Sequence, residues 1–197
     1  MEHITIFPTV IWKGESELDN HRLRDKCYDF QKDNEGQTIS NVGGYQGDGF
    51  YDEKFAEFVI ESVPRLQGET KKYLPPMEVY SWVNINGVGH YNEPHSHYNQ
   101  MTPTFLSGVY YVSVPEKSGV IRFFDPRGSM VKGSLDQDYY FNSAPFQYLQ
   151  PEDGMILLFP SWLEHDVTGN YNPDEEERIS IGFNVVFPPQ TEENIER

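Results

Sequence analysis

The chain has 197 residues, of which 37% are hydrophobic and 15% aromatic, enough to bury one full hydrophobic core. Its formal net charge of −16 argues against general nucleic-acid binding, because such a field repels phosphate backbones at long range. No apolar run approaches the length of a membrane span, and the N-terminus lacks the basic region of a secretory signal, so we expect a soluble, cytoplasmic protein.

The N-terminal part of the chain predicts one strand and two helices. Residues 4–12 have the composition of a strand, and residues 15–32 carry apolar side chains at nearly helical spacing. A loop at 41–47 precedes a second helix, which Asp52 can cap. Its apolar residues recur at three- and four-residue steps and predict one buried stripe: Phe55, Phe58, Val59, Val63 and Leu66. Two consecutive prolines, at 75 and 76, end this helical half.

From Met77 onward, short β-type runs alternate with turns, which predicts a β-rich architecture rather than a helical bundle. The irregular stretch 125–144 is long for a compact β domain, and loops of this length often act as lids or binding loops. The expected strands cover residues 78–84, 104–114, 119–124, 146–149, 155–159 and 178–187, with a short strand near Val167.

Three of the six histidines form a candidate metal site. Residues two apart in a strand point to the same face, so His95 and His97 can aim two imidazoles at one point. His165 follows the apolar run 155–159 and a proline, where the chain is expected to turn back. Three such ligands occupy one triangular face of an octahedral ion and leave the other open, which is the arrangement of non-haem Fe(II) oxygenases. The simpler alternative is a set of hydrogen-bonded structural histidines.

The last predicted strand has one polar and one apolar face. Arg178 and Ser180 lie on the polar face with Gly182 and Asn184, while the intervening residues are apolar. A guanidinium fork with a hydroxyl two residues later suits a carboxylate ligand. The alternative is an edge strand whose polar face is solvated.

Two further segments, residues 107–111 (SGVYY) and 159–165 (FPSWLEH), complete a pattern that runs from about Ser81 to Phe187. This pattern resembles the Fe(II)/2-oxoglutarate-dependent oxygenase superfamily, and within it a group of oxygenases marked by these two segments. The resemblance implies a mainly β fold, a double-stranded β-helix (a jelly roll with cupin-like architecture) over 77–189. Residues 1–76 would add an N-terminal strand and supporting helices, giving a single domain over 1–197.

The resemblance also implies a function and residues that carry it out. The chain is expected to be a 2-oxoglutarate-dependent dioxygenase, a hydroxylase that uses Fe(II) and takes 2-oxoglutarate as cosubstrate. Arg178 and Ser180 match the pair that grips the far carboxylate of 2-oxoglutarate, and Tyr111 falls where related enzymes place a tyrosine hydroxyl on it. Asn84, on the strand before the histidine pair, is a further candidate. No catalytic residue beyond the metal ligands is expected.

His95 and His165 match the superfamily's proximal and distal histidine ligands, but the chain departs from the pattern between them. The superfamily normally has Asp or Glu where this chain has His97, so three neutral imidazoles leave the site one negative charge short. Glu93 and Asp125 are the alternative third ligands. Since imidazole binds metal in its neutral form, we expect iron affinity to fall as the pH drops through the histidine range near 6.5.

The substrate is not identified by the sequence; a small molecule or a protein side chain are both compatible with the pattern. Arg122, Arg127 and Trp162 are the candidate substrate contacts, the two arginines because positive charges are scarce in this chain. Ordinary ion pairs with neighbouring carboxylates are the alternative role for the arginines. Arg127 and Lys132 belong to the expected lid at 125–144.

Two other classes of function remain open from the residues alone. A cupin-type dioxygenase or isomerase that needs no 2-oxoglutarate would share the histidines, with Gln100 near the place where cupins often carry a Glu ligand. A non-catalytic binding protein could keep the same barrel. The Arg178 and Ser180 pair favours the oxygenase, because a cupin has no fixed need for it.

Overall fold

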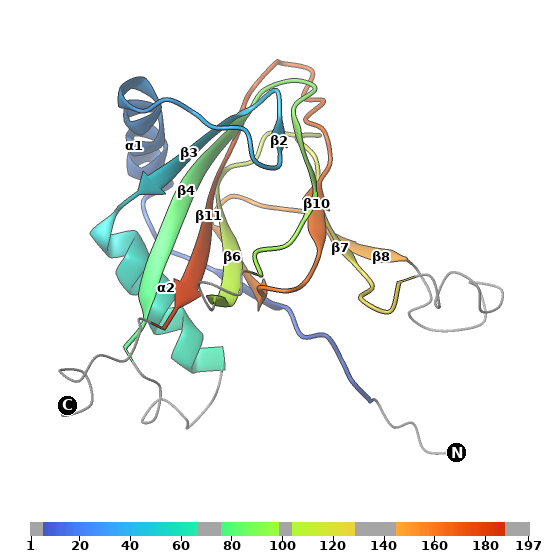
Figure 1. Ribbon diagram of the computed structural model, residues 1–197. Coiled ribbons are helices and arrows are strands. Elements are labelled where there is room, and N and C mark those ends of the chain that lie inside the picture. The colour runs from blue at the N-terminus through green and yellow to red at the C-terminus, as the bar shows by residue number, and fades with distance from the viewer. Residues whose placement is uncertain (1–5, 67–75, 99–103, 129–144, 188–197) are drawn as a thin grey trace.

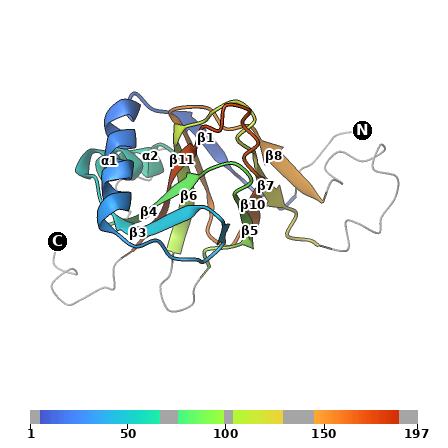
Figure 2. The ribbon, with the colours of Figure 1, turned by 90° about the horizontal axis from the view of Figure 1, so that it is seen from above.

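The computed structural model describes residues 6–66, 76–98, 104–128 and 145–187. Within them, two antiparallel sheets lie face to face, and two helices cover the outer face of the larger sheet (Figures 1 and 2). The elements in chain order are β1 (Trp12–Glu15), α1 (Asn20–Asp33), β2 (Asn41–Val42), β3 (Tyr45–Phe50), α2 (Glu53–Leu66), β4 (Glu78–Asn86), β5 (Tyr91–His95), β6 (Thr104–Ser113), β7 (Ile121–Phe124), β8 (Phe146–Leu149), β9 (Met155–Pro160), β10 (His165–Val167) and β11 (Arg178–Val186).

The strand order is what places the site. The larger sheet runs β1-β9-β6-β11-β4-β3 and the smaller one β2-β5-β10-β7-β8, so strands distant in sequence become neighbours. β11 lies at the middle of the larger sheet, between β6 and β4, and β10 at the middle of the smaller one, between β5 and β7. Two antiparallel sheets of six and five strands, with the chain passing repeatedly from one sheet to the other, form the expected double-stranded β-helix.

Two apolar clusters hold the layers together. The first lies between the helices and the larger sheet and includes Leu23 and Cys27 of α1, Val59 of α2, and Ile181 and Phe183 of β11, all with no exposed surface. The second lies between the two sheets and is smaller: Tyr111, Ile121, Phe123, Met155, Leu157, Phe159 and Leu163. Because the space between the sheets is only partly filled by this cluster, it also contains a pocket.

Asp52 caps α2 and ties it to α1. Its Oδ1 accepts a hydrogen bond from the backbone N–H of Phe55 at 3.0 Å, as expected for a capping residue. Its carboxylate also receives both terminal nitrogens of Arg22, at 2.6 and 3.0 Å, and the ammonium group of Lys26. These charges hold the pKa of Asp52 far below its ordinary value, chiefly through the hydrogen bonds from Arg22.

The β-rich half matches the predicted strands closely, and the N-terminal half less well. The strand expected at 4–12 is displaced to β1, and the predicted loop at 41–47 instead contains β2 and the start of β3. Gly43 and Gly44 connect these two strands, and β3 itself contains Gly47 and Gly49 with little apolar alternation. The two strands therefore form through their pairing with β5 and β4 rather than through a pattern in their own sequence. Pro75 lies outside the described ranges, and Pro76 is the first described residue after that gap. Of the expected lid at 125–144, residues 129–144 also lie outside the described ranges.

No helix in the described ranges is long and apolar enough to cross a bilayer.

Candidate functional site: a histidine triad beside a buried arginine

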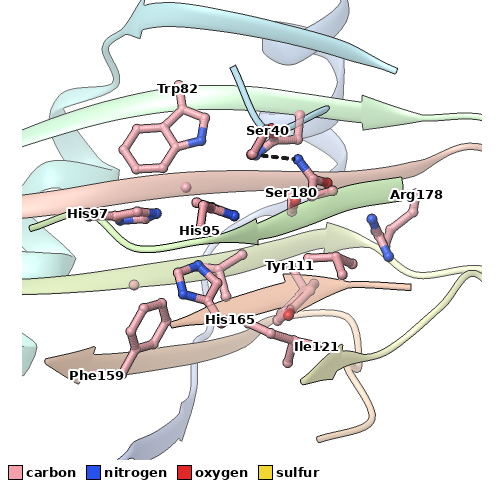
Figure 3. Close-up of a pocket in the computed structure, with 16 residues that line it drawn as sticks. Ser40, Trp82, His95, His97, Tyr111, Ile121, Phe159, His165, Arg178 and Ser180 are labelled. Carbon is pink, nitrogen blue, oxygen red and sulfur yellow. Dashed lines mark hydrogen bonds between the residues drawn. The ribbon is translucent and has the colours of Figure 1, made fainter. Parts of the chain in front are cut away.

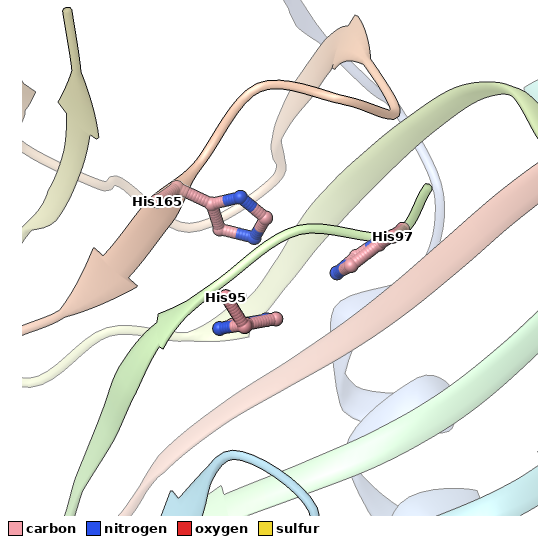
Figure 4. A group of neighbouring side chains, drawn as sticks. All are labelled: His95, His97 and His165. Carbon is pink, nitrogen blue, oxygen red and sulfur yellow. The ribbon is translucent and has the colours of Figure 1, made fainter. Parts of the chain in front are cut away.

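His95, His97 and His165 all line the pocket, and Figure 4 shows their rings pointing toward one another. His95 ends β5 and is the register partner of His165, which begins β10. The ring centroids of His95 and His165 are 4.4 Å apart, and His97 lies 5.2 and 5.0 Å from them. One ligand atom from each ring lies within 4.8 Å of the others, and the described residues contain no second group of this kind. Although His97 lies two residues beyond the end of β5, it still reaches the common point.

The hydrogen bonds of the three rings leave one nitrogen of each available. Nδ1 of His95 lies 2.7 Å from the carbonyl oxygen of Glu93, and Nδ1 of His165 lies 2.9 Å from that of Leu163. A carbonyl oxygen only accepts, so each Nδ1 carries the proton and each Nε2 keeps its lone pair. Nδ1 of His97 lies 2.9 Å from Oδ1 of Asn184. The three rings are thus prepared to bind a metal through Nε2.

Burial keeps these imidazoles neutral. Desolvation, with a smaller contribution from the neighbouring rings, lowers the pKa of His97 to about 4 and that of His165 to about 3. The pKa of His95 is also lowered, mainly by burial. The range near 6.5 expected from the sequence therefore does not apply to this cluster, and protons compete with a metal only at lower pH.

Arg178 lies at the other end of the same pocket (Figure 3). Its side chain is almost fully buried, with 2% of the residue exposed, and Nη1 donates to the carbonyl oxygen of Ser118 at 2.8 Å. No carboxylate in the described part of the chain pairs with it, and burial lowers its pKa to about 10. A buried guanidinium without an anion is costly, which indicates a site for an anionic ligand.

Two polar side-chain atoms in this part of the pocket also lack partners among the described residues. Ser180 is the register partner of Tyr111 on β6 and of Asn84 on β4, and all three line the pocket. The hydroxyl of Tyr111 and Oδ1 of Asn84 are buried without a hydrogen bond in the described residues. Buried polar atoms are rarely left unpaired in native proteins, so these atoms indicate that a polar molecule belongs between them.

Several lining residues were not singled out by the sequence. Trp82 forms the wall beside His97, with ring centroids 5.2 Å apart, and Phe159 packs against His165 at 4.8 Å. Ser40 and Asn92, joined by a hydrogen bond of 3.2 Å, also line the pocket. Aromatic residues in strands usually belong to a core, so nothing in the sequence distinguishes these from packing residues.

The candidate substrate contacts do not line this pocket. Arg122 forms a bidentate ion pair with Asp166 at 2.8 and 2.5 Å, and Arg127 pairs with Asp125 at 2.6 Å. Trp162 is 48% exposed. The two arginines thus have the ion pairs considered as their alternative role, and their contact with substrate stays a prediction.

The two alternative third ligands lie outside the histidine cluster. Asp125 is engaged by Arg127, and Glu93 presents its backbone carbonyl to His95 while its residue is exposed. Neither carboxylate belongs to the potential metal-binding group, which within the described residues holds only histidines. Gln100 and Lys132 lie outside the described ranges.

Solved structures share this fold at low sequence identity. A prolyl-4-hydroxylase from Pseudomonas putida is similar with a TM-score of 0.62 at 14% identity, over 90% of this chain and 92% of that one. A prolyl hydroxylase from Trichoplax adhaerens, in complex with a hypoxia inducible factor peptide, gives 0.61 at 14% identity over 90% and 83%. The α-ketoglutarate-dependent carbocyclase SnoK from nogalamycin biosynthesis gives 0.62 at 13% identity over 95% and 85%. These likenesses establish the double-stranded β-helix.

No curated protein sequence matches the chain. A family model does: the family described as "Putative 2OG-Fe(II) oxygenase" matches residues 80–184, more than half of the chain and the part that contains the pocket. The family uses Fe(II) and 2-oxoglutarate, and the histidine triad fits such a metal. The chain therefore belongs to this family and is an Fe(II)- and 2-oxoglutarate-dependent oxygenase.

Proposed function

We propose that His95, His97 and His165 hold the iron through Nε2, and that the enzyme is a hydroxylase of a small molecule or a protein side chain. The histidines supply the donor type that suits Fe(II), and each ring has its Nδ1 committed elsewhere. Three ligands on one side leave the opposite side of an octahedral ion for the cosubstrate, oxygen and substrate.

In this proposal the far carboxylate of 2-oxoglutarate binds Arg178. The observation that carries the proposal is that this buried guanidinium has no anionic partner among the described residues, yet shares a pocket with the histidines. The Ser180 and Tyr111 hydroxyls donate further hydrogen bonds to the same carboxylate. If the amide of Asn84 is turned over, Nδ2 takes the place of the unpaired Oδ1 and can donate a hydrogen bond to the same carboxylate.

The protein contributes to the reaction by orienting the cosubstrate and by excluding water from the pocket. When bound, iron and 2-oxoglutarate together supply the activation of O2 and the oxidising power. Arg178 fixes the direction in which the cosubstrate enters, because a charged fork at one end admits the carboxylate only one way round. Trp82 and Phe159 keep water from the histidine end with apolar surface.

The charge of the site favours a dianionic cosubstrate. The pocket contains one arginine and three neutral imidazoles, and no described lining residue is Asp or Glu. With a divalent metal its charge is three positive units, of which 2-oxoglutarate neutralises two. A carboxylate in place of His97 would neutralise one more, so this chain depends more strongly on the cosubstrate for charge balance than the usual ligand set does.

The test uses the whole chain without oxygen. Fe(II) binding is measured by competition with a chromogenic chelator, and addition of 2-oxoglutarate is followed by the visible charge-transfer band of its iron chelate. We expect the wild type to bind iron and to show the band. His95→Ala, His97→Ala and His165→Ala should lose both iron binding and the band. The exposed His21→Ala is the matched control and should bind iron normally.

The same measurement separates the alternatives. Iron bound with no band on adding 2-oxoglutarate would favour a cupin-like enzyme and contradict the proposal. If His97→Ala keeps its iron while Asp125→Asn or Glu93→Gln loses it, the third ligand is a carboxylate and the assignment of His97 is wrong. Hydroxylation is then sought by mass spectrometry on candidate small molecules and peptides, as a gain of one oxygen atom that depends on 2-oxoglutarate.

A further inference from the structure

His97 is held differently from the other two histidines. His95 and His165 lie within strands, and the Nδ1 of each faces a carbonyl oxygen two residues earlier in its own segment. His97 lies beyond the end of β5, and its Nδ1 faces a side chain from a distant strand, Oδ1 of Asn184 in β11, at 2.9 Å. The orientation of this ring therefore depends on β11 rather than on its local backbone.

The amide of Asn184 is itself oriented by a second partner. Oγ of Ser107 donates to Oδ1 of Asn184 at 2.8 Å, and the two residues are opposite each other in the β11–β6 register. Ser107 has no exposed surface, so water does not compete for this bond. Both neighbours thus meet the oxygen of the amide. Facing an oxygen, Nδ1 of His97 must carry the proton, and the lone pair is left on Nε2.

We infer that Asn184 is a positioning residue that selects the tautomer of His97 and aims its Nε2 at the metal; this rests on the proposed iron site. An amide turned the other way would donate from Nδ2 to Nδ1 and leave a proton on Nε2, where it would block the metal. The other contacts of His97 do not make this choice. Its backbone N–H donates to the Ser161 carbonyl at 2.9 Å, and the Trp82 ring only flanks it.

Substitutions at Asn184 should change metal binding in a graded way. Asn184→Ala and the nearly isosteric Asn184→Leu remove the acceptor, and loss of such an outer partner typically lowers metal affinity by about 10- to 100-fold. Asn184→Asp keeps an acceptor at the same place and adds a negative charge behind the ring. It should keep the Nδ1-protonated tautomer and bind metal at least as tightly as the wild type. Ser107→Ala, which frees the amide to turn, should lie between.

Two measurements on the full chain test this. Proton–nitrogen NMR spectra of apo protein labelled with 15N-histidine report which ring nitrogen carries the proton, with His97 assigned by its absence in His97→Gln. Co(II) affinity, as a stand-in for Fe(II), is measured by competition with a chromogenic chelator. We expect an Nδ1–H tautomer for His97 in the wild type and in Asn184→Asp, and a mixture of tautomers in Asn184→Ala.

Asn41→Ala is the matched control. Asn41 is a buried asparagine with two hydrogen bonds, to the carbonyl of Gly44 and from the N–H of Ile39, and it touches no ligand histidine. It should lower the melting temperature without changing Co(II) affinity or the His97 tautomer, which is what a merely structural loss looks like.

The inference is overturned if Asn184→Ala keeps the wild-type tautomer and Co(II) affinity, or if Asn184→Asp is as impaired as Asn184→Ala. Should Asn184→Ala fail to fold, Asn184→Asp and Ser107→Ala decide the matter. A wild type that binds no Co(II) would contradict the proposed iron site instead. In that case the tautomer, measured without metal, still decides whether Asn184 orients His97.

Discussion

Arg178 donates its hydrogen bond from Nη1 to the backbone carbonyl oxygen of Ser118, at 2.8 Å, and this neutral acceptor is its partner in the described part of the protein. A carbonyl dipole offsets only part of the cost of burying a positive charge. The consequence is that the site is built for a ligand at the expense of stability.

Arg178→Met should therefore stabilise the apo protein while abolishing its response to 2-oxoglutarate. Removing an unpaired buried charge is favourable, and the loss of the Ser118 hydrogen bond offsets about 1 kcal/mol of this gain. We expect the free energy of unfolding in urea to rise by about 1 kcal/mol. The wild type should gain stability on adding 2-oxoglutarate with Mn(II), and the variant should not.

Arg122→Met is the contrasting control, because its removal leaves Asp166, whose side chain is 5% exposed, without its partner. Since Arg122 is a third exposed, we expect a loss of about 2 kcal/mol rather than the full value for a buried pair, with the 2-oxoglutarate response intact. If both variants lose stability alike and both keep the response, Arg178 is an ordinary structural arginine.

The sequence predicted those parts of the site that depend on strand periodicity. Alternation in β11 correctly placed Arg178 and Ser180 in the pocket and Ile181 in the core, because a strand buried on both sides must present successive residues to opposite faces. The convergence of His95 with His165 was predicted from the resemblance and is confirmed by their register pairing.

The rest depended on which strands become neighbours. The contact of His97 with Asn184 joins residues 87 positions apart, across the two sheets, and no local pattern specifies it. The first half of β3 was predicted as part of a loop because the glycines here remove the side chains from which alternation is recognised, and its pairing with β4 reveals the strand. Tertiary partners, rather than local propensity, decide such elements.

The apo protein should lose stability as the pH falls from 6.5 toward 4. The folded-state pKa values of His97 and His165, about 4 and 3, lie below the ordinary value near 6.5. Unfolding therefore takes up protons in this window; the contribution is complete above pH 6.5 and is lost as the pH falls toward 4. The slope is about 1.4 kcal/mol per pH unit for each histidine that gains a proton on unfolding.

Urea unfolding in EDTA at several pH values measures this slope. Replacing His97 and His165 by glutamine should flatten it, whereas His21→Gln, at an exposed position, should leave it unchanged. An equal slope in all three proteins would show that the cluster titrates normally.

Asp52 should be the main acid-sensitive support of the helical layer. Its side chain is 2% exposed, it caps α2, and Arg22 and Lys26 bind it. Asp52→Asn should lower the free energy of unfolding at pH 7 by about 3 kcal/mol, since it leaves two cations without their buried partner and weakens the cap.

The folded structure favours the charged form of Asp52, whereas it disfavours the charged form of the histidines. The pKa of Asp52 is depressed in the folded state, so its contribution is complete above the unfolded value of about 3.9 and is lost as the pH falls below it. The difference between wild type and Asp52→Asn should therefore shrink between pH 4 and pH 2. Asp25→Asn, an exposed position on α1, should show neither effect.

Gly182→Ala should disturb the histidine end of the pocket by moving Trp82. Gly182 is the register partner of Trp82, and a methyl group at this position would clash with Cε2 of the indole. The ring must then turn away from His97, at a cost of about 1–3 kcal/mol for overpacking.

The fluorescence of Trp82 measures this movement. In a background with Trp12→Phe and Trp162→Phe, the emission of Trp82 should be quenched by Co(II) in the parent protein and much less in Gly182→Ala. Gly87→Ala, whose added methyl meets its nearest neighbour, His90, at an ordinary 3.4 Å, should retain the quenching. Unchanged quenching in Gly182→Ala would mean that Trp82 does not need this glycine to stand beside the metal, and that the pocket wall is formed in some other way.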